Sequence, residues 1–256
     1  MKAKYSILFL FALLLQNSCK DDVEIKNFYP MNIGTSWNYE TTRYFSCYDS
    51  VGKFVELFHT YALKKTIIKK DTIVNSLKLR QFVTTHYENP NPYNDALYYK
   101  EEKDGLKLYG ESYYNGVSSL TIIIDSIANY NFSSNKKSVN PESKVKKDLS
   151  SNFIFYKTPI VEIKYPIIEN SEWGYYGGQL KRVIKKDTLY INNNPFSCYK
   201  FEIVDPYYEY YYEWISESGL LQYEFQTSLT NWIDNDVIIG KIKTHEIMKV
   251  TSMTIK

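Results

Sequence analysis

An internal duplication constrains the fold of this chain more than any other feature of its sequence. Three short blocks occur twice, in the same order and with the same spacing inside each block. The matched residues are Tyr29, Pro30, Gly34, Trp37 and Tyr39 with Tyr165, Pro166, Asn170, Trp173 and Tyr175; Ile68 to Thr72 with Ile184 to Thr188; and Tyr98, Gly105, Leu106 and Tyr109 with Tyr212, Gly219, Leu220 and Tyr223. Such self-similarity is typical of repeated structural units. We therefore expect two copies of one unit.

The repeated blocks are typical of β-hairpins. Strand-like runs flank Asn75-Ser76 in the first copy and Asn192-Asn193 in the second, and asparagine tolerates the left-handed backbone of tight turns. A further hairpin turns at Asp104-Gly105 and again at Ser218-Gly219, where glycine supplies the positive φ that short hairpins need. Helical periodicity is weak throughout. The sequence therefore predicts a mainly β fold, with antiparallel, curved or open-barrel sheets built from two internally repeated halves.

One aromatic run is the clearest single strand. Alternate residues of a strand point to opposite faces, so the run separates into an aromatic face and a mixed face. The aromatic face holds Tyr208, Tyr210, Tyr212 and Trp214, and the mixed face holds Tyr207, Glu209, Tyr211 and Glu213. We expect the aromatic face to be the buried one.

These patterns divide the chain into segments. We predict a signal peptide at 1–18, a lipidated tether at 19–28, a first β repeat at 29–132, a linker or long loop at 133–162 and a second β repeat at 163–256. The linker is predicted because residues 133–151 are rich in Ser, Lys and Asn and contain Pro141.

The N-terminus has the layout of a secretory signal peptide. Lys2 and Lys4 supply positive charge, the apolar run from Ile7 to Leu15 follows, and a small residue, Ser18, marks the cut. A membrane-spanning helix needs roughly twenty apolar residues. The short run therefore favours export over a permanent transmembrane anchor.

The residues around the cut resemble those of bacterial lipoproteins. Ser18 followed by Cys19 is similar to a lipobox, although Gln16 stands where a lipobox usually has leucine. The next three residues, Lys20-Asp21-Asp22, resemble the signal that directs Bacteroidetes lipoproteins to the outer face of the outer membrane. The resemblance implies that lipid on Cys19 holds the chain to the outer membrane, facing the cell exterior.

The mature chain begins like a known group of proteins. The segment from Tyr29 to Tyr39 resembles the "YPL-x-x-G-x-x-W-x-Y" start of uncharacterised Bacteroidetes-type surface lipoproteins. The group's common motifs are structural, so the resemblance implies no catalytic residue. Some related envelope proteins have open, half-barrel sheets like those of lipoprotein carriers, which is an analogy of fold alone.

Charge and composition exclude one class of partner. Removal of residues 1–18 takes away Lys2 and Lys4, so 31 basic residues become 29, against 29 acidic residues. A neutral mature chain gives no electrostatic reason to bind nucleic acid. The 26 tyrosines favour half-buried sheet surfaces.

The two remaining cysteines are candidates for a disulfide. Cys47 and Cys198 both lie in predicted strands of an exported chain, and an oxidising compartment permits a bridge between them. The sequence alone leaves both the bridged and the free state open.

No motif for metal binding or catalysis is present. The three histidines, His59, His86 and His245, lack partners at metal-ligand spacing, and no cofactor is expected. The two acids that the repeat fixes, Asp71 and Asp187, each precede threonine, and we expect their side chains to bond nearby backbone N–H groups.

Among the aromatic residues, Trp232 is the better candidate for stacking on a ligand. It lies beside Asn231 and Asp234 in a loop-like stretch without a counterpart in the first repeat. The repeated tryptophans, Trp37 and Trp173, are instead expected in the core.

Three classes of function remain open. The favoured hypothesis is a non-catalytic, surface-exposed lipoprotein that binds a glycan, a protein or a lipid, or that has a structural role in building the envelope. The alternative is a periplasm-facing carrier or assembly factor with an apolar groove. A glycan-active hydrolase is the third, because such enzymes need only two carboxylates.

Overall fold

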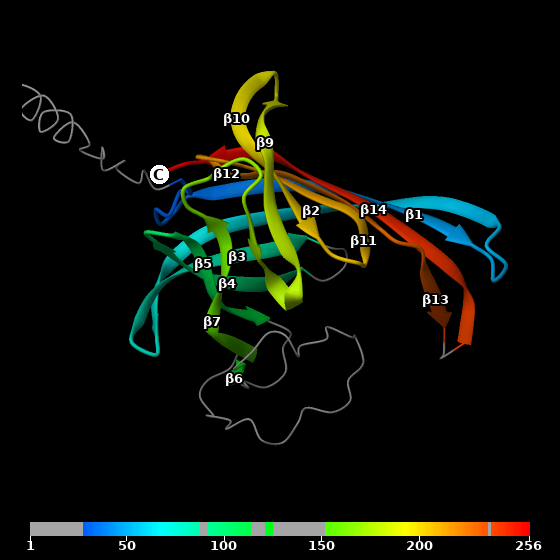
Figure 1. Ribbon diagram of the computed structural model, residues 1–256, viewed down its shortest axis with the longest axis horizontal. Helices are drawn as coiled ribbons and strands as arrows, with labels where there is room; N and C mark the ends of the chain where they lie inside the picture. Colours follow the sequence, from blue (N-terminus) through cyan, green and yellow to red (C-terminus); the bar gives the residue numbers. More distant parts are fainter. Residues whose placement is uncertain (1–27, 88–91, 114–120, 125–151, 235–236) are drawn as a thin grey trace, which may run out of the picture.

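The computed structural model describes residues 28–87, 92–113, 121–124, 152–234 and 237–256, and these residues are almost entirely β-structure (Figure 1). The strands are β1 (Ser36–Tyr48), β2 (Phe54–Val74), β3 (Leu77–Tyr87), β4 (Tyr93–Glu102), β5 (Gly105–Tyr113), β6 (Thr121–Ile124), β7 (Asn152–Lys164), β8 (Glu172–Gly174), β9 (Leu180–Ile191), β10 (Asn194–Val204), β11 (Tyr208–Ser216), β12 (Gly219–Thr227), β13 (Thr230–Asp234) and β14 (Val237–Thr254). One short 3-10 turn, η2 (Tyr176–Gly178), lies between β8 and β9. The predicted mainly β fold is confirmed.

All strands belong to one curved sheet of 14 strands. Its order is β6-β7-β5-β4-β3-β2-β1-β14-β12-β11-β10-β9-β8, with β13 attached to β14. Neighbours are antiparallel, except that β6 lies parallel to β7. The long β1–β14 pair joins the two halves, and Figure 1 shows β1, β2 and β14 running together beyond the curved part of the sheet. The predicted curved, open-barrel architecture is therefore also confirmed.

Matching positions of the two predicted repeats have matching backbone geometry. Asn75 and Ser76 have φ values of 48° and 65°, and Asn192 and Asn193 have values of 50° and 65°. The two halves also run through the sheet in the same order, from β1 to β7 and from β8 to β14. Descent of the two halves from one duplicated ancestor stays a prediction.

The two repeated tryptophans are both buried and both bond to a main-chain carbonyl. The indole N–H of Trp37 donates to the carbonyl of Ser218 over 2.6 Å, and that of Trp173 donates to Val161 over 2.7 Å. The second bond joins β8 to β7, the two strands at which the sheet nearly closes on itself. Trp173 therefore helps to close the barrel-like sheet. Both tryptophans are buried in the core, as the sequence predicted.

The predicted linker ends earlier than expected. Residues 152–162, assigned to the linker, belong to strand β7, which pairs with β5. Ile154, Tyr156 and Ile160 of this strand are buried, so apolar packing fixes the segment. Pro159 interrupts the strand-like pattern of this segment, so the sequence did not indicate a strand here. Residues 133–151 lie outside the described part of the chain.

The orientation predicted for the aromatic strand is wrong for Tyr210 and Tyr212, although Trp214 of the same predicted face is buried. Tyr211, Glu213 and Ile215 of β11 line the hollow inside the sheet, so Tyr210 and Tyr212 point to the opposite face. There the Lys200 Nζ atom lies 3.5 Å from the centre of the Tyr212 ring. The strand therefore turns its mixed face, with a carboxylate, toward the interior.

Candidate functional site

A cavity of about 330 Å³ lies within the curve of the sheet. This volume falls at the lower end of the range for small-molecule sites. Residues of both halves line it, from β2 to β5 on one side and from β11, β12 and β14 on the other. Its tyrosines are Tyr29, Tyr39, Tyr99, Tyr175, Tyr211 and Tyr223. Apolar side chains lie between these tyrosines in the cavity wall. The cavity therefore offers a largely apolar surface with tyrosine hydroxyl groups at fixed points.

A buried ion cluster forms part of the cavity wall. The Nζ atom of Lys181 lies 2.6 Å from a carboxylate oxygen of Glu162 and 2.7 Å from one of Glu213. Lys181 is fully buried, whereas Glu162 and Glu213 reach the cavity. The hydroxyl of Tyr175 donates to Glu162, at 3.0 Å from the nearer oxygen. Strands β7, β9 and β11 thus each bring one charged side chain to the same point.

The protonation of this cluster follows from burial and from mutual attraction. Burial alone disfavours the ammonium of Lys181, but Glu162 and Glu213 together raise its pKa above the usual value. Burial raises the pKa of Glu213; Lys181 opposes this rise and Glu162 adds to it. Lys181 is therefore held in its charged form between the two glutamates.

Two further polar groups line the cavity. The Nε2 atom of His86 lies 2.7 Å from a carboxylate oxygen of Asp95, and the His86 ring stacks on Tyr93. The ammonium of Lys64 donates to the Tyr223 hydroxyl over 3.2 Å. These contacts hold the polar side chains in fixed positions around the apolar space.

The tyrosine hydroxyls act as neutral groups. Burial raises the pKa of Tyr99, Tyr175 and Tyr211 well above the usual value, and nearby carboxylates raise it further. Glu162 and Glu213 contribute to the rise of the Tyr99 pKa, and all three side chains line the cavity. Within the described residues the Tyr99 hydroxyl has no hydrogen-bond partner of its own. It is therefore free to bond a ligand.

The arrangement of the two carboxylates differs from that of a hydrolytic pair. A glycosidase places its acid and its nucleophile or base on either side of the bond to be cut. Here the ammonium of Lys181 contacts both Glu162 and Glu213. Among the described residues, no three metal-ligating side chains come together either.

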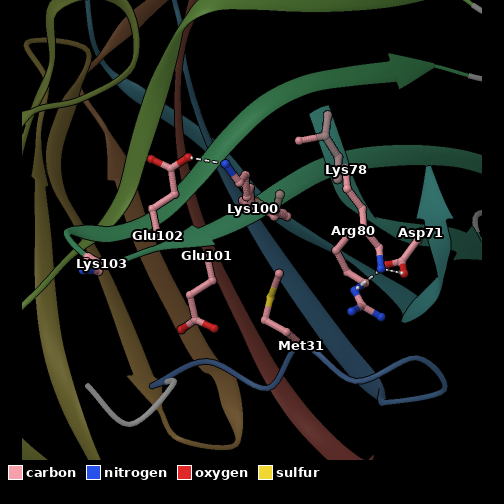
Figure 2. Close-up of a pocket in the computed structure, with 10 residues that line it drawn as sticks. Met31, Asp71, Lys78, Arg80, Lys100, Glu101, Glu102 and Lys103 are labelled. Carbon is pink, nitrogen blue, oxygen red and sulfur yellow. Dashed lines mark hydrogen bonds and ion pairs between the residues drawn. The ribbon is translucent and has the colours of Figure 1, made fainter. Parts of the chain in front are cut away.

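A larger but more open groove, of about 610 Å³, lies outside the cavity (Figure 2). Its charges pair with one another: Asp71 lies 2.9 Å from Lys78 and 3.1 Å from Arg80, and Lys100 lies 2.8 Å from Glu102. Figure 2 shows Asp71 of β2 beside Arg80 of β3, and Lys100 and Glu102 together on β4. Glu101 accepts a hydrogen bond from the Tyr165 hydroxyl over 2.9 Å, so among the described charged residues that line the groove only Lys103 has no such partner. The groove is therefore the weaker candidate.

The two repeated aspartates differ in their partners. Asp187 accepts a hydrogen bond from the backbone N–H of Thr188 over 3.0 Å, as expected for a strand-end acid. Asp71 instead pairs with Lys78 and Arg80 across its hairpin. The expected backbone bond is therefore found in the second copy, whereas the first copy has side-chain partners.

The bridged state that the sequence left open is not formed, since Cys47 and Cys198 are both free thiols. Cys47 is on β1 and Cys198 on β10, and β14, β12 and β11 lie between these strands. Neighbouring strands are about 4.8 Å apart, whereas a disulfide needs Cα atoms within about 7 Å of each other. The fold itself keeps the thiols apart.

The other predicted site residues lie away from the cavity or outside the description. Cys19, Lys20, Asp21 and Asp22 precede the described residues. Trp232 is in strand β13, opposite Gly240 of β14, rather than in a loop, and the description does not extend to its side chain. No described segment forms a helix with the length and apolarity that crossing a bilayer requires.

None of the three residues of the ion cluster was predicted from the sequence as a site residue. Glu162 fell within the predicted linker, Glu213 was assigned to the face turned from the core, and Lys181 carried no motif. One signal was available for Glu213, because it alternates with Tyr211 and Ile215 and so shares a face with bulky residues.

The chain has few similarities to known proteins. No protein-family model matches it, and no curated protein matches it. One similar solved structure is a "putative lipoprotein" from Parabacteroides distasonis, with 14% identity, a TM-score of 0.33, and coverage of 88% of this chain and 97% of that chain. Another is a "putative exported protein with YmcC-like fold" from Bacteroides fragilis, with 11% identity, a TM-score of 0.32, and coverage of 89% and 98%. At these scores the likeness transfers no residue and no activity.

Proposed function

We propose that this protein is a lipid-anchored lipoprotein of the cell envelope that binds a small molecule inside its curved sheet without transforming it. The cavity of about 330 Å³ carries the binding part of this proposal. The N-terminal pattern around Cys19, with Lys20-Asp21-Asp22 behind it, supports anchoring in the outer membrane with the domain facing outward. Lipid on the cysteine tethers the chain, while the folded domain stays in water.

The cavity wall suits a ligand that is partly apolar. Tyrosine rings present an apolar body and a polar tip, so they can cover hydrocarbon and still bond a polar group of the ligand. Burial of apolar area contributes about 25 cal/mol per Å². Leu97, Leu108 and Met248 add purely apolar surface between the tyrosines. A ligand with both apolar and polar parts therefore matches this wall best.

A carrier is the second candidate, and the apolar share of the wall favours it. A carrier would face the periplasm and pass its cargo on, whereas a surface binder would keep its ligand outside the cell. Both use the same cavity. Protease accessibility of the domain on intact cells separates them, because only the surface-displayed form is reachable.

The cavity can be tested by filling it. Leu97→Trp adds an indole to the cavity wall, and Ile73→Trp adds the same group at an exposed site that is 76% accessible. We would measure binding of the neutral dye N-phenyl-1-naphthylamine by fluorescence, on the mature chain and on both variants. The expected result is dye binding that Leu97→Trp reduces at least tenfold and Ile73→Trp leaves unchanged.

Two results would overturn the proposal: no dye binding by the unaltered protein, or equal binding by the two variants. Leu108→Phe is a milder filling substitution on β5, for use if Leu97→Trp does not fold. Circular dichroism and thermal unfolding confirm that each variant is folded before binding is compared.

A further inference from the structure

We propose that the cavity selects ligands that carry a positive charge, and that the cation lies between Tyr99 and the carboxylates of Glu162 and Glu213. The inference rests on the proposed function, since it names the chemical class of the ligand for the same cavity. It goes further because it excludes the anionic lipids and fatty acids that an apolar cavity alone would admit.

The first argument is the charge of the wall. The carboxylates that line the cavity are Asp95, Glu162 and Glu213, and the fixed cations are Lys64, which lines it, and Lys181, which contacts Glu162 and Glu213. Counted without His86, the carboxylates are in excess. Charges in a poorly hydrated interior interact more strongly than at the surface. The wall therefore attracts a cation and repels an anion.

The position of the excess charge follows from the contacts. Lys181 is the one ammonium that contacts both Glu162 and Glu213, so it balances only one of the two carboxylates. Lys64 and Arg43 are on the other side of the cavity, where both pair with Glu246. The uncompensated carboxylate is therefore at the Lys181 cluster. Glu213 belongs to this cluster and is buried, with a relative exposure of 7%.

The second argument comes from the aromatic rings. The electron-rich face of a tyrosine attracts a cation within about 6 Å. The protein already places its own cations in this way: Lys181 Nζ is 4.8 Å from the centre of the Tyr175 ring, and Lys64 Nζ is 5.7 Å from that of Tyr223. In the described part of the chain, Tyr99 has no such cation over its ring and no partner for its hydroxyl. The Tyr99 ring contacts that of Phe82, with 4.9 Å between the ring centres, and the Tyr99 hydroxyl is left for a ligand.

The residues of the two arguments line one cavity. Tyr99, Glu162 and Glu213 all line the same cavity of about 330 Å³. An ammonium or guanidinium group there could bond the hydroxyl, lie on the ring and approach the carboxylates at the same time. The apolar remainder of the ligand would fill the space toward Leu97 and Leu108.

Three probes that differ only in the charge of the head group test this inference. They are octyltrimethylammonium, octanol and octanoate, each used to displace N-phenyl-1-naphthylamine from the mature protein at pH 7. We expect the ammonium probe to bind at least tenfold more tightly than octanoate, with octanol between them. Glu213→Gln should reduce this preference several-fold, and Glu209→Gln, at an exposed site on the same strand, should leave it unchanged.

The outcomes separate the two proposals. Equal affinities for the three probes, or tighter binding of octanoate, would overturn charge selection while leaving the binding cavity in place. Failure of all three probes to displace the dye, or no dye binding at all, would overturn the proposed function itself. The comparison of probes on the unaltered protein decides the matter even if Glu213→Gln does not fold.

Discussion

Gly219 of the second half lies directly against the indole of Trp37 in the first half. A Cβ atom built on Gly219 would be 2.7 Å from the Trp37 Nε1 atom and 2.8 Å from two ring carbons. The residue also has a φ of 105°, which side chains rarely adopt. Both residues belong to the repeated blocks, so the contact couples the opening block of the first predicted repeat to the β11–β12 hairpin of the second.

The substitution Gly219→Ala should destabilise the fold strongly. The new methyl group meets a fully buried tryptophan, and the backbone is strained as well, so we expect a loss of about 2–4 kcal/mol in the free energy of unfolding. Gly52→Ala is a matched control, because Gly52 has a φ of 86° but nothing within 4 Å of a Cβ. We expect this control to lose about 1–2 kcal/mol. Urea unfolding measures both, and equal losses would show that the Trp37 contact is unimportant.

Removal of the buried ammonium should cost more than removal of a surface one. Lys181→Met leaves Glu162 and Glu213 facing each other without a cation, and breaking a buried ion cluster in this way costs about 3–5 kcal/mol. Lys185→Met is the control on the same strand, since its side chain is 55% exposed and its pair with Asp187 spans 3.4 Å. An exposed pair contributes at most about 1 kcal/mol. Similar losses for the two variants in urea unfolding would contradict the central role of Lys181.

The turns were predictable from the sequence because their chemistry is local. Asn192-Asn193 and Gly219 have the positive φ values that short hairpins require, and the sequence placed turns at both. The curvature of the sheet was predicted only by an analogy of fold with related envelope proteins. The turns account for the order of neighbouring strands such as β2 with β3 or β11 with β12, but not for the pairing of β1 with β14.

The face of each strand was harder to predict than the strand itself. Alternation separates Tyr210 and Tyr212 from Tyr211 and Glu213, but it does not say which set faces inward. The direction in which the whole sheet curves decides that, and this direction depends on pairings such as β1 with β14, far apart in the sequence. Tyr210 and Tyr212 therefore point away from the cavity, whereas Glu213 points into it.

The candidate site could not be predicted from local sequence patterns, for the same reason. Glu162, Lys181 and Glu213 are separated in the chain and meet only because β7 and β9 approach each other where the sheet nearly closes. None of the three belongs to a motif. Only the high tyrosine content of the chain hinted at an aromatic-lined interior.

Glu102 should make the protein sensitive to acid. Hydrogen bonds from Lys100, Lys107 and Tyr109 lower the pKa of Glu102 from 4.5 to about 2. A carboxylate with a lowered pKa stabilises the fold above its unfolded pKa, and this contribution disappears as the pH falls toward 2. The stability difference between the unaltered protein and Glu102→Gln should thus be largest near pH 6 and shrink steadily below pH 4.5. Tyr109→Phe, which removes one of the bonds, should fall between them, and a difference that is constant with pH would contradict the assignment.

Lipid attachment should depend on one thiol. Cys19→Ala removes the sulfur that would carry acyl chains, so we expect no incorporation of a fatty-acid analogue into this variant in the native host. Cys47→Ala is the control, because Cys47 is buried in β1 and should leave labelling unchanged. Undiminished labelling of Cys19→Ala would reject the lipobox. Detergent partitioning gives an independent measurement, since an unlipidated chain should move to the aqueous phase.

Display on the cell exterior should require the charged residues that follow the cysteine. Replacement of Lys20, Asp21 and Asp22 by alanine leaves Cys19 in place, so lipid attachment should persist while transfer to the outer face fails. Proteinase K added to intact cells should therefore degrade the unaltered protein and spare the triple variant. Lysed cells should show equal digestion of both, because the folded domain is the same. Equal digestion on intact cells would mean that these residues form only a solvated tether, and protection of the unaltered protein would favour the periplasm-facing carrier.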